Sequence, residues 1–222
     1  MPTKELAVYA PFPFVLWHLD LEDPSFDFAL DTLSEYERRK AASFAFERDR
    51  VRYRRTHAGL RQLLAEFLNI PASKIDIVEK PQQKPYLLDF PRLSFSISHS
   101  ETHALVGLSD SAEVGVDIEV VRAIGDRHGM AKSIFTANEQ FALANVSPAD
   151  ADRYFLQCWT RKEACVKAIG QGLSIPPHGF EVGIELDYTV VLISTPQADY
   201  RVGVQSFNVS PAFSVAVAQV MR

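Results

Sequence analysis

Short segments in which apolar and polar residues alternate, joined by only a few residues, constrain the fold of this chain most strongly. Three of them follow closely on one another: Leu93–Ser98, Ala104–Ser109 and Val114–Val120. Connections this short predict an antiparallel meander. The other predicted strands are 14–19 near the start and four segments of the tail, 180–186, 189–194, 200–207 and 213–220.

Helical patterns separate these strands. The spacing of Ser34 and Glu37 is that of a capping box and predicts a helix start, and a longer helix is predicted over 50–68. Two more are predicted over 131–143 and 152–169, the last one stopped by Gly170. Helices combined with antiparallel strands indicate an α+β fold in two halves, 1–112 and 113–222.

The composition is that of a globular protein. The chain has 222 residues, of which 47% are hydrophobic and 23% charged. No apolar run approaches the length that spans a bilayer, and the first residues do not resemble a signal peptide. Cys158 and Cys165 lie on one face of a predicted helix, which favours buried thiols in a reducing compartment. We therefore expect a cytoplasmic protein without a membrane partner.

Charge is unevenly distributed along the chain. The net charge is −5, yet nine Lys or Arg residues lie between Arg38 and Arg61, opposed there only by Glu47 and Asp49. A basic stretch in an acidic protein indicates a polyanionic partner, either phosphates or nucleic acid. A solvated helix face is the alternative.

Two acidic residues mark the segment VGVDIE. In a strand, Asp117 and Glu119 point to the same face, about 7 Å apart. Carboxylates this close repel one another when they are partly buried, and a divalent cation relieves the repulsion. Mg²⁺ is bound in proteins by one or two carboxylates together with substrate phosphates. An acidic but solvent-facing strand is the alternative.

The helix predicted over 152–169 carries charge on its apolar side. Lys162 falls within the apolar stripe, and Glu163 and Lys167 lie together along its edge. The simple interpretation is a lysine that extends to solvent beside an ordinary surface ion pair. The functional interpretation requires a metal and a polyanion nearby.

At the segment FSISHS, Ser96 and Ser98 lie on one strand face together with the preceding Ser94, and His99 lies at the strand end. Hydroxyls and an imidazole in this position suit phosphate recognition. No GxSxG motif surrounds the serines, so a hydrolase triad is not indicated. The sequence also has no P-loop, GxGxxG or zinc-ligand spacing.

The order of these motifs is more specific than any one of them. Lys84-Pro85, then FSISHS, then VGVDIE, then WTRKEACVKAIGQGL resembles the Sfp-type 4′-phosphopantetheinyl transferases, over roughly residues 34–176. The resemblance implies a pseudo-twofold fold of two similar α+β halves, with coenzyme A in the cleft between them. It also implies a monomeric enzyme that transfers the phosphopantetheine arm to a serine of an acyl or peptidyl carrier protein. Adenosine 3′,5′-bisphosphate is released, and Mg²⁺ is required.

The resemblance also assigns roles to individual residues. Asp117, Glu119 and Glu163 are expected to hold Mg²⁺, with Glu163 as the candidate general base, either directly or through a metal-bound water. The resemblance implies that Lys162 contacts a coenzyme phosphate, that Lys167 contacts the leaving group, and that Ser98 and His99 contact the nucleotide end. Near the 3′-phosphate it places Lys84 and Arg52. Lys40 matches a lysine that the family uses on the coenzyme, less securely. The chain departs from the family at Gln83, where a glycine often precedes the Lys-Pro pair, and at Glu37, where the family has a lysine.

Two rival hypotheses remain at this point. A nucleic-acid-binding protein would use the arginine-rich residues 38–61 without catalysis and would leave the acidic strand without a role. An inactive relative would bind carrier proteins as a scaffold. The intact set of Asp117, Glu119, Glu163 and Lys167 favours the enzyme over both.

Overall fold

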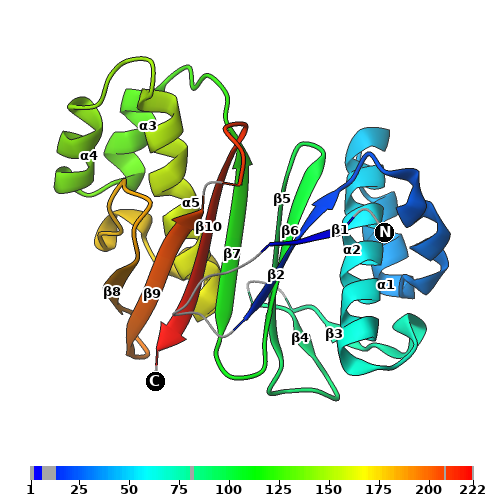
Figure 1. Cartoon of the computed structure of the whole chain (residues 1–222). Helices are drawn as coiled ribbons and strands as arrows, with labels where there is room; N and C mark the ends of the chain where they lie inside the picture. Colours follow the sequence, from blue (N-terminus) through cyan, green and yellow to red (C-terminus); the bar gives the residue numbers. More distant parts are fainter. Residues whose placement is uncertain (1–2, 7–13, 81–82, 208, 222) are drawn as a thin grey trace.

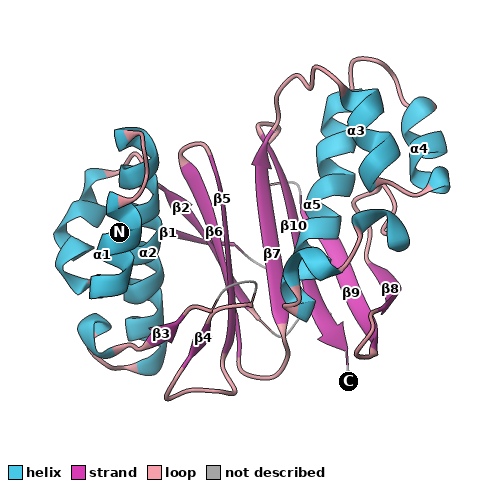
Figure 2. Ribbon diagram, turned by 180° about the vertical axis from the view of Figure 1, so that it is seen from behind, coloured by secondary structure: helices cyan, strands magenta, loops and turns pink. Residues whose placement is uncertain are grey.

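The computed structural model describes residues 3–6, 14–80, 83–207 and 209–221. Two four-stranded antiparallel sheets lie side by side, and helices cover the outer side of each (Figures 1 and 2). The first sheet has the order β1 (Thr3–Leu6), β2 (Val15–Asp20), β6 (His103–Ser109), β5 (Ser94–Ser100). The second has the order β7 (Val114–Val120), β10 (Phe213–Met221), β9 (Asp199–Phe207), β8 (Thr189–Ser194).

The helices divide between the two sheets. The first sheet is covered by η1 (Pro24–Thr32), α1 (Glu35–Ala42) and α2 (Glu47–Leu68), followed by η2 (Ala72–Lys74) and the small hairpin β3 (Ile77–Val78) and β4 (Tyr86–Leu87). The second is covered by α3 (Arg127–Ile134), α4 (Ala137–Ala144) and α5 (Ala151–Ile169), with short turns η3 (Gly172–Ser174) and η4 (Pro177–Gly179). The α+β prediction is confirmed. In the part of the chain just described, no helix is long and apolar enough to cross a membrane.

Both halves follow the same path. In the first, β2 leads through α1 and α2 to β5 and β6; in the second, β7 leads through α4 and α5 to β9 and β10. The matching strands occupy matching places, β2-β6-β5 in one sheet and β7-β10-β9 in the other. The chain crosses from one sheet to the other between Ser109 and Val114. The functions assigned to the halves 1–112 and 113–222 stay predictions.

The predicted meander is wrong at its third strand, because β7 leaves the first sheet and lies beside β5. The β7 backbone is joined to β5 by hydrogen bonds to serine hydroxyls of β5, and not by the backbone hydrogen bonds of a β-ladder. The Oγ atoms of Ser94, Ser96 and Ser100 each accept a hydrogen bond of 3.1 Å, from the amides of Val114, Val116 and Val120. The alternating serines of β5 therefore serve mainly to connect the two halves.

The segment predicted as one helix over 131–143 forms α3 and α4 instead. Thr136 begins α4 with a capping box, in which its hydroxyl accepts from the Glu139 amide and Glu139 accepts from the Thr136 amide. This cap satisfies the free amides of a new helix, so the chain restarts after Phe135. The T-x-x-E spacing was present in the sequence and signals the break.

The strand predicted over 180–186 is also wrong. Most of its described backbone hydrogen bonds go to side chains of the helices, and only the Leu186 carbonyl, at its end, accepts from a strand, at the Ser206 amide of β9. Arg161 donates to the Val182 carbonyl and Gln157 to the Ile184 carbonyl, while Glu139 accepts from the Val182 amide. The other three tail strands form as β8, β9 and β10, and Cys158 and Cys165 are buried free thiols as predicted.

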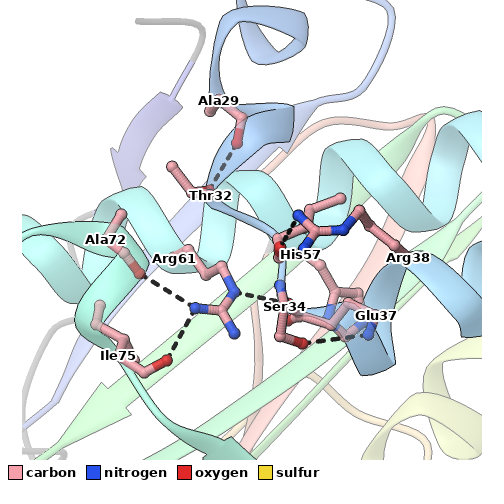
Figure 3. A network of polar contacts seen from close by, with 10 residues as sticks. Ala29, Thr32, Ser34, Glu37, Arg38, His57, Arg61, Ala72 and Ile75 are labelled. Atoms are coloured by element: carbon pink, nitrogen blue, oxygen red, sulfur yellow. Dashed lines mark hydrogen bonds and ion pairs between the residues drawn. The ribbon is translucent and has the colours of Figure 1, made fainter.

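A buried ion pair follows the capping box in each half. Glu37 caps α1 and pairs with Arg61 of α2 at 2.7 Å, and Glu139 caps α4 and pairs with Lys162 of α5 at 2.8 Å. All four side chains are at most 2% exposed. Equivalent glutamates thus bind equivalent long helices to the short helices before them. In the first half Arg61 also donates to the carbonyls of Ala72 and Ile75 (Figure 3).

Low pH should lower the folding stability of the first half, because it protonates the Glu37 carboxylate. Burial alone would raise the pKa of Glu37, but hydrogen bonds from His57 and Ser34 and the charge of Arg61 lower it from 4.5 to about 2. A depressed folded-state pKa stabilises the fold above the unfolded value and loses that contribution as the pH falls from 4.5 towards 2. We expect Glu37→Gln to remove up to about 3 kcal/mol of this pH-dependent stability.

Urea unfolding at pH 7 and at pH 3 measures this difference. The matched control is Glu35→Gln on the same helix, since the Glu35 side chain is 77% exposed and pairs only with Arg39. Equal pH dependence in the Glu37 variant and the wild-type protein would contradict the prediction.

Candidate active site

Gly115 of β7 lets α5 lie directly on the second sheet. A Cβ atom at this position would meet the Ala164 carbonyl oxygen at 1.9 Å and the Ala168 amide nitrogen at 2.4 Å. No side chain fits there, so a glycine is required. The close approach brings Glu163 and Lys167 of α5 next to Asp117, two residues beyond the glycine.

A cavity of about 440 Å³ lies where the two halves meet. It is lined by Tyr53, Thr56 and His57 of α2, Ile97, Ser98 and His99 of β5, Asp117 and Glu119 of β7, and Trp159, Glu163 and Lys167 of α5. A second cavity of about 350 Å³ shares Ile97, Glu163 and Lys167 with the first and extends to Lys84. Six of the ten residues predicted for the site thus surround one cavity, and a seventh lines its neighbour.

Lys167 joins the two halves at the centre of the site. Its Nζ atom lies 2.6 Å from Asp117 Oδ1 and 2.9 Å from Ser98 Oγ, and the Ser98 hydroxyl donates to the same Oδ1 at 2.7 Å. The predicted surface pair between Glu163 and Lys167 is replaced by this ion pair with Asp117. Ser98 lines the cavity with its hydroxyl already bonded.

Burial and the charge of Asp117 raise the pKa of two neighbouring carboxylates. Burial, then the charge of Asp117, raises the pKa of Glu163, and Lys167 opposes part of the effect. Burial also raises the pKa of Glu119, with Asp117 adding to it and the Ser100 hydroxyl opposing it. The second oxygen of Asp117, Oδ2, is buried and has no hydrogen-bond partner among the residues that the structure describes. The three carboxylates therefore concentrate negative charge in the cavity, and bound cations would balance it.

The carboxylates do not form a ready metal cage. Among the described residues, no three His, Cys, Asp or Glu side chains are grouped so that they could hold a metal ion. The donor types are those Mg²⁺ prefers, and the unpartnered Asp117 Oδ2 offers it an oxygen. The residues therefore fit the ion in chemistry, while the side chains need to move to bind it.

His99 lies near the end of β5. Desolvation by neighbouring atoms and the positive charges of Lys167 and Arg52 lower its pKa, and Asp117 opposes the shift. The ring is consequently kept neutral near pH 7. A neutral imidazole can still donate one hydrogen bond to a phosphate.

Lys84, Arg52 and Lys40 are three other residues predicted to contact the coenzyme, and none of them lines the first cavity. The Lys84 ammonium group has three acceptors, Ser94 Oγ and Glu113 Oε2 at 2.7 Å and the Val114 carbonyl at 2.8 Å. Burial lowers the pKa of Lys84, and Glu113 opposes the shift. Arg52 pairs with Glu101 at 2.8 Å, and Lys40 lies exposed on α1. Their contacts with a coenzyme stay predictions.

The prediction for Lys162 is wrong. Its Nζ atom is bound to Glu139 and donates to the carbonyls of Pro177 and Phe180 at 2.8 and 2.6 Å. The side chain is fully buried within the second half, so it cannot reach a coenzyme phosphate. Most of the apolar stripe of α5 faces the core of this half, and Trp159, Glu163 and Lys167 line the cavity.

Four residues without a predicted site role also line the cavity: Tyr53, Thr56, His57 and Trp159. Within the described part of the chain, the buried hydroxyls of Tyr53 and Thr56 have no hydrogen-bond partner. Tyr53 stacks on His57 at 4.0 Å, and His57 Nδ1 lies 3.2 Å from Glu37 Oε1. The signal was their i, i+3 and i, i+4 spacing on one face of the predicted helix.

Three arginines of the basic stretch pair with acidic residues from elsewhere in the chain. Arg55 pairs with Asp27 at 2.7 Å, Arg52 with Glu101 at 2.8 Å, and Arg61 with Glu37 at 2.7 Å. These pairs lower the local excess of positive charge, which weakens the case for a nucleic-acid partner.

Sequence comparisons agree with this geometry in both halves. Residues 113–218 match the model of the 4′-phosphopantetheinyl transferase superfamily, and residues 17–110 match that of the 4′-phosphopantetheinyl transferase N-terminal region. The protein HetI of a Nostoc species, named a 4′-phosphopantetheinyl transferase, is 31% identical over 165 residues, or 72% of this chain and 69% of that protein. This chain belongs to the 4′-phosphopantetheinyl transferase superfamily.

Two Bacillus transferases match over longer stretches. The 4′-phosphopantetheinyl transferase psf-1 of Bacillus pumilus is 30% identical over 183 residues, covering 82% of this chain and 77% of that protein. The 4′-phosphopantetheinyl transferase ffp of Bacillus subtilis is 29% identical over 191 residues, covering 86% and 84%. The resemblance to Sfp-type transferases is confirmed along most of the chain.

Proposed function

We propose that this protein transfers the 4′-phosphopantetheine arm of coenzyme A to a serine of an acyl or peptidyl carrier protein. The observation that carries the proposal is the cavity between the halves. In it, Lys167 and the carboxylates of Asp117, Glu119 and Glu163 meet at the centre of a 4′-phosphopantetheinyl transferase fold. Anion-binding and cation-binding groups side by side suit a substrate with a pyrophosphate.

Coenzyme A is expected to lie along the wall formed by α2 and β5. His99 and the free hydroxyls of Tyr53 and Thr56 can donate to phosphate oxygens, and Lys167 can supply positive charge. Lys84, Arg52 and Lys40 are further candidates at the edge of this region. Lys84 would have to exchange one of its present acceptors for a phosphate.

Mg²⁺ is the proposed cofactor, held by Asp117, Glu119 and Glu163. When bound, it would neutralise charge on the pyrophosphate oxygens, which is usually a large contribution in phosphoryl transfer. The raised pKa values of Glu119 and Glu163 support the assignment, because a cation would relieve the repulsion that raises them.

Glu163 is the proposed general base. In the reaction the serine oxygen of the carrier forms a bond to the pantetheine-side phosphorus, and the bond from this phosphorus to the bridging oxygen breaks. The serine proton passes to the Glu163 carboxylate, and adenosine 3′,5′-bisphosphate leaves. Lys167 would stabilise charge on the leaving group.

We further propose that the protein acts as a monomer in the cytoplasm and has no nucleic-acid partner. One chain supplies both walls of the cavity, so a second copy is not needed to complete the site. The pairing of the arginine-rich stretch with Asp27, Glu37 and Glu101 speaks against a nucleic-acid surface.

The experiment that tests the function is incubation with apo carrier proteins, coenzyme A and Mg²⁺, followed by intact mass measurement. The carriers should come from fatty-acid, polyketide and nonribosomal-peptide systems. We expect a gain of one phosphopantetheine arm, lost with EDTA and restored by added Mg²⁺. Replacing the acceptor serine of a carrier with alanine should abolish the gain. Failure to modify any carrier would contradict the proposal.

A further inference from the structure

The central carboxylate of the site is already bound by a cation of the protein itself. Lys167 Nζ lies 2.6 Å from Asp117 Oδ1, and the Ser98 hydroxyl donates to the same oxygen at 2.7 Å. The Asp117 side chain is only 6% exposed, so solvent contributes little to its solvation. Lys167 is therefore the main charge that balances Asp117.

Lys167 is also able to leave this position. Its side chain is 30% exposed, and lysine has a flexible stem with a compact charged end. Mg²⁺ binds carboxylate oxygens at about 2.0–2.1 Å. An ammonium group held at 2.6 Å from Oδ1 would then be close to the ion, and the two cations would repel one another.

From this contact we infer that Lys167 and the divalent cation compete for Asp117, and that coenzyme A resolves the competition. The inference rests on the proposed function, in which Lys167 binds the substrate phosphates. A phosphate that draws Lys167 away frees the carboxylate, whose other oxygen already has no partner. Metal binding is then weak without coenzyme and strong with it. Because binding free energies are linked, the metal must strengthen coenzyme binding by the same factor.

The lack of a ready metal cage in the described residues agrees with this order of events. Glu119 is held by the Ser100 hydroxyl at 2.7 Å and Asp117 by Lys167, so the two strand carboxylates are engaged separately. Lys167 thus acts as a positioning residue for the metal, in addition to its proposed contact with the substrate.

Binding of Mn²⁺, followed through the electron paramagnetic resonance signal of the free ion, tests the competition without coenzyme. We expect Lys167→Met to bind Mn²⁺ about 5- to 150-fold more tightly than the wild-type protein, the usual range of coupling between sites. Lys167→Arg keeps a cation at this place and should bind Mn²⁺ as weakly as the wild type. Lys167→Gln serves as a second neutral variant if the methionine variant is unstable.

Removing any positive charge near a metal site strengthens metal binding to some extent, so a matched control is needed. Arg122 affects the same region, because its charge opposes the rise in the pKa of Glu119, but it is exposed and Asp117 pairs with Lys167 instead. Arg122→Met should therefore change Mn²⁺ binding only slightly. An equal gain in the Arg122 and Lys167 variants, or no gain in Lys167→Met, would overturn the inference.

The same titration with coenzyme A present, and no carrier protein, measures the coupling. Coenzyme should tighten Mn²⁺ binding to the wild-type protein much more than to Lys167→Met, in which no competitor remains to be displaced. An equal effect of coenzyme on both proteins would contradict the competition. Since no turnover occurs, these binding measurements are independent of the transfer assay. A negative outcome in one experiment therefore does not contradict the proposal that the other one tests.

Discussion

Glu163→Gln should fold normally, bind coenzyme A and transfer its arm at least about a hundredfold more slowly than the wild-type protein. The substitution keeps the size of the side chain but removes the proposed proton acceptor and one charge from the metal site. Loss of a general base alone typically lowers kcat by about 10²- to 10⁴-fold. Steady-state transfer to an apo carrier protein, together with coenzyme titration, separates the loss in kcat from any change in binding.

If Glu163 formed only a surface ion pair with Lys167, the same variant would give a different result. An exposed i, i+4 ion pair contributes less than about 0.5 kcal/mol, so its loss would hardly change rate or stability. The structure pairs Lys167 with Asp117 instead and places Glu163 on the cavity wall. Glu66→Gln, an exposed glutamate of α2, is the matched control and should leave kcat unchanged. Near-native kcat in Glu163→Gln would remove the residue from the mechanism.

Lys162→Met should cost about 3–5 kcal/mol of folding stability, because it leaves the Glu139 carboxylate buried without its cation. The two side chains are 0% and 1% exposed, so water cannot replace the lost partner. Denaturant unfolding measures the loss. The double variant Lys162→Met with Glu139→Gln removes both charges and should recover part of it.

Coenzyme binding distinguishes this structural role from the one that the family resemblance implied. Whatever fraction of Lys162→Met is folded should bind coenzyme A as the wild type does. Lys167→Met, one turn further along α5 and on the cavity wall, should bind it more weakly. Weakened coenzyme binding in Lys162→Met, with stability retained, would restore Lys162 to the phosphate site.

The fold class and most of the site were readable in the sequence because they depend on local spacing. Alternation with period two places Asp117 and Glu119 on one strand face, and a helical turn separates Glu163 from Lys167. The motif order then indicated the family, whose members bring these segments together. The capping boxes at Ser34 and Thr136 are equally local, although only the first was interpreted.

Other features depended on contacts between distant segments. Whether Lys162 faces the cavity or the core depends on a rotation of α5 about its axis, which the close contact at Gly115 determines. The stripe pattern leaves that rotation uncertain by about one residue, or 100°. In the same way, Tyr53, Thr56 and His57 became part of the site only when α2 packed beside β5.

The sequence by itself determined most of the longer helices and strands, the family and the chemical groups available for catalysis, since these follow from periodicity, caps and motifs within short segments. The tertiary structure alone decided which strand neighbours which, and which charges meet. The serines of β5 hold β7 across the joint between the halves, Asp27, Glu37 and Glu101 pair with three arginines of the basic stretch, and Lys167 pairs with Asp117 rather than with Glu163. The physical reason is that hydrogen bonds and ion pairs form between atoms close in space, and packing places together residues 20 to 50 or more positions apart in the chain.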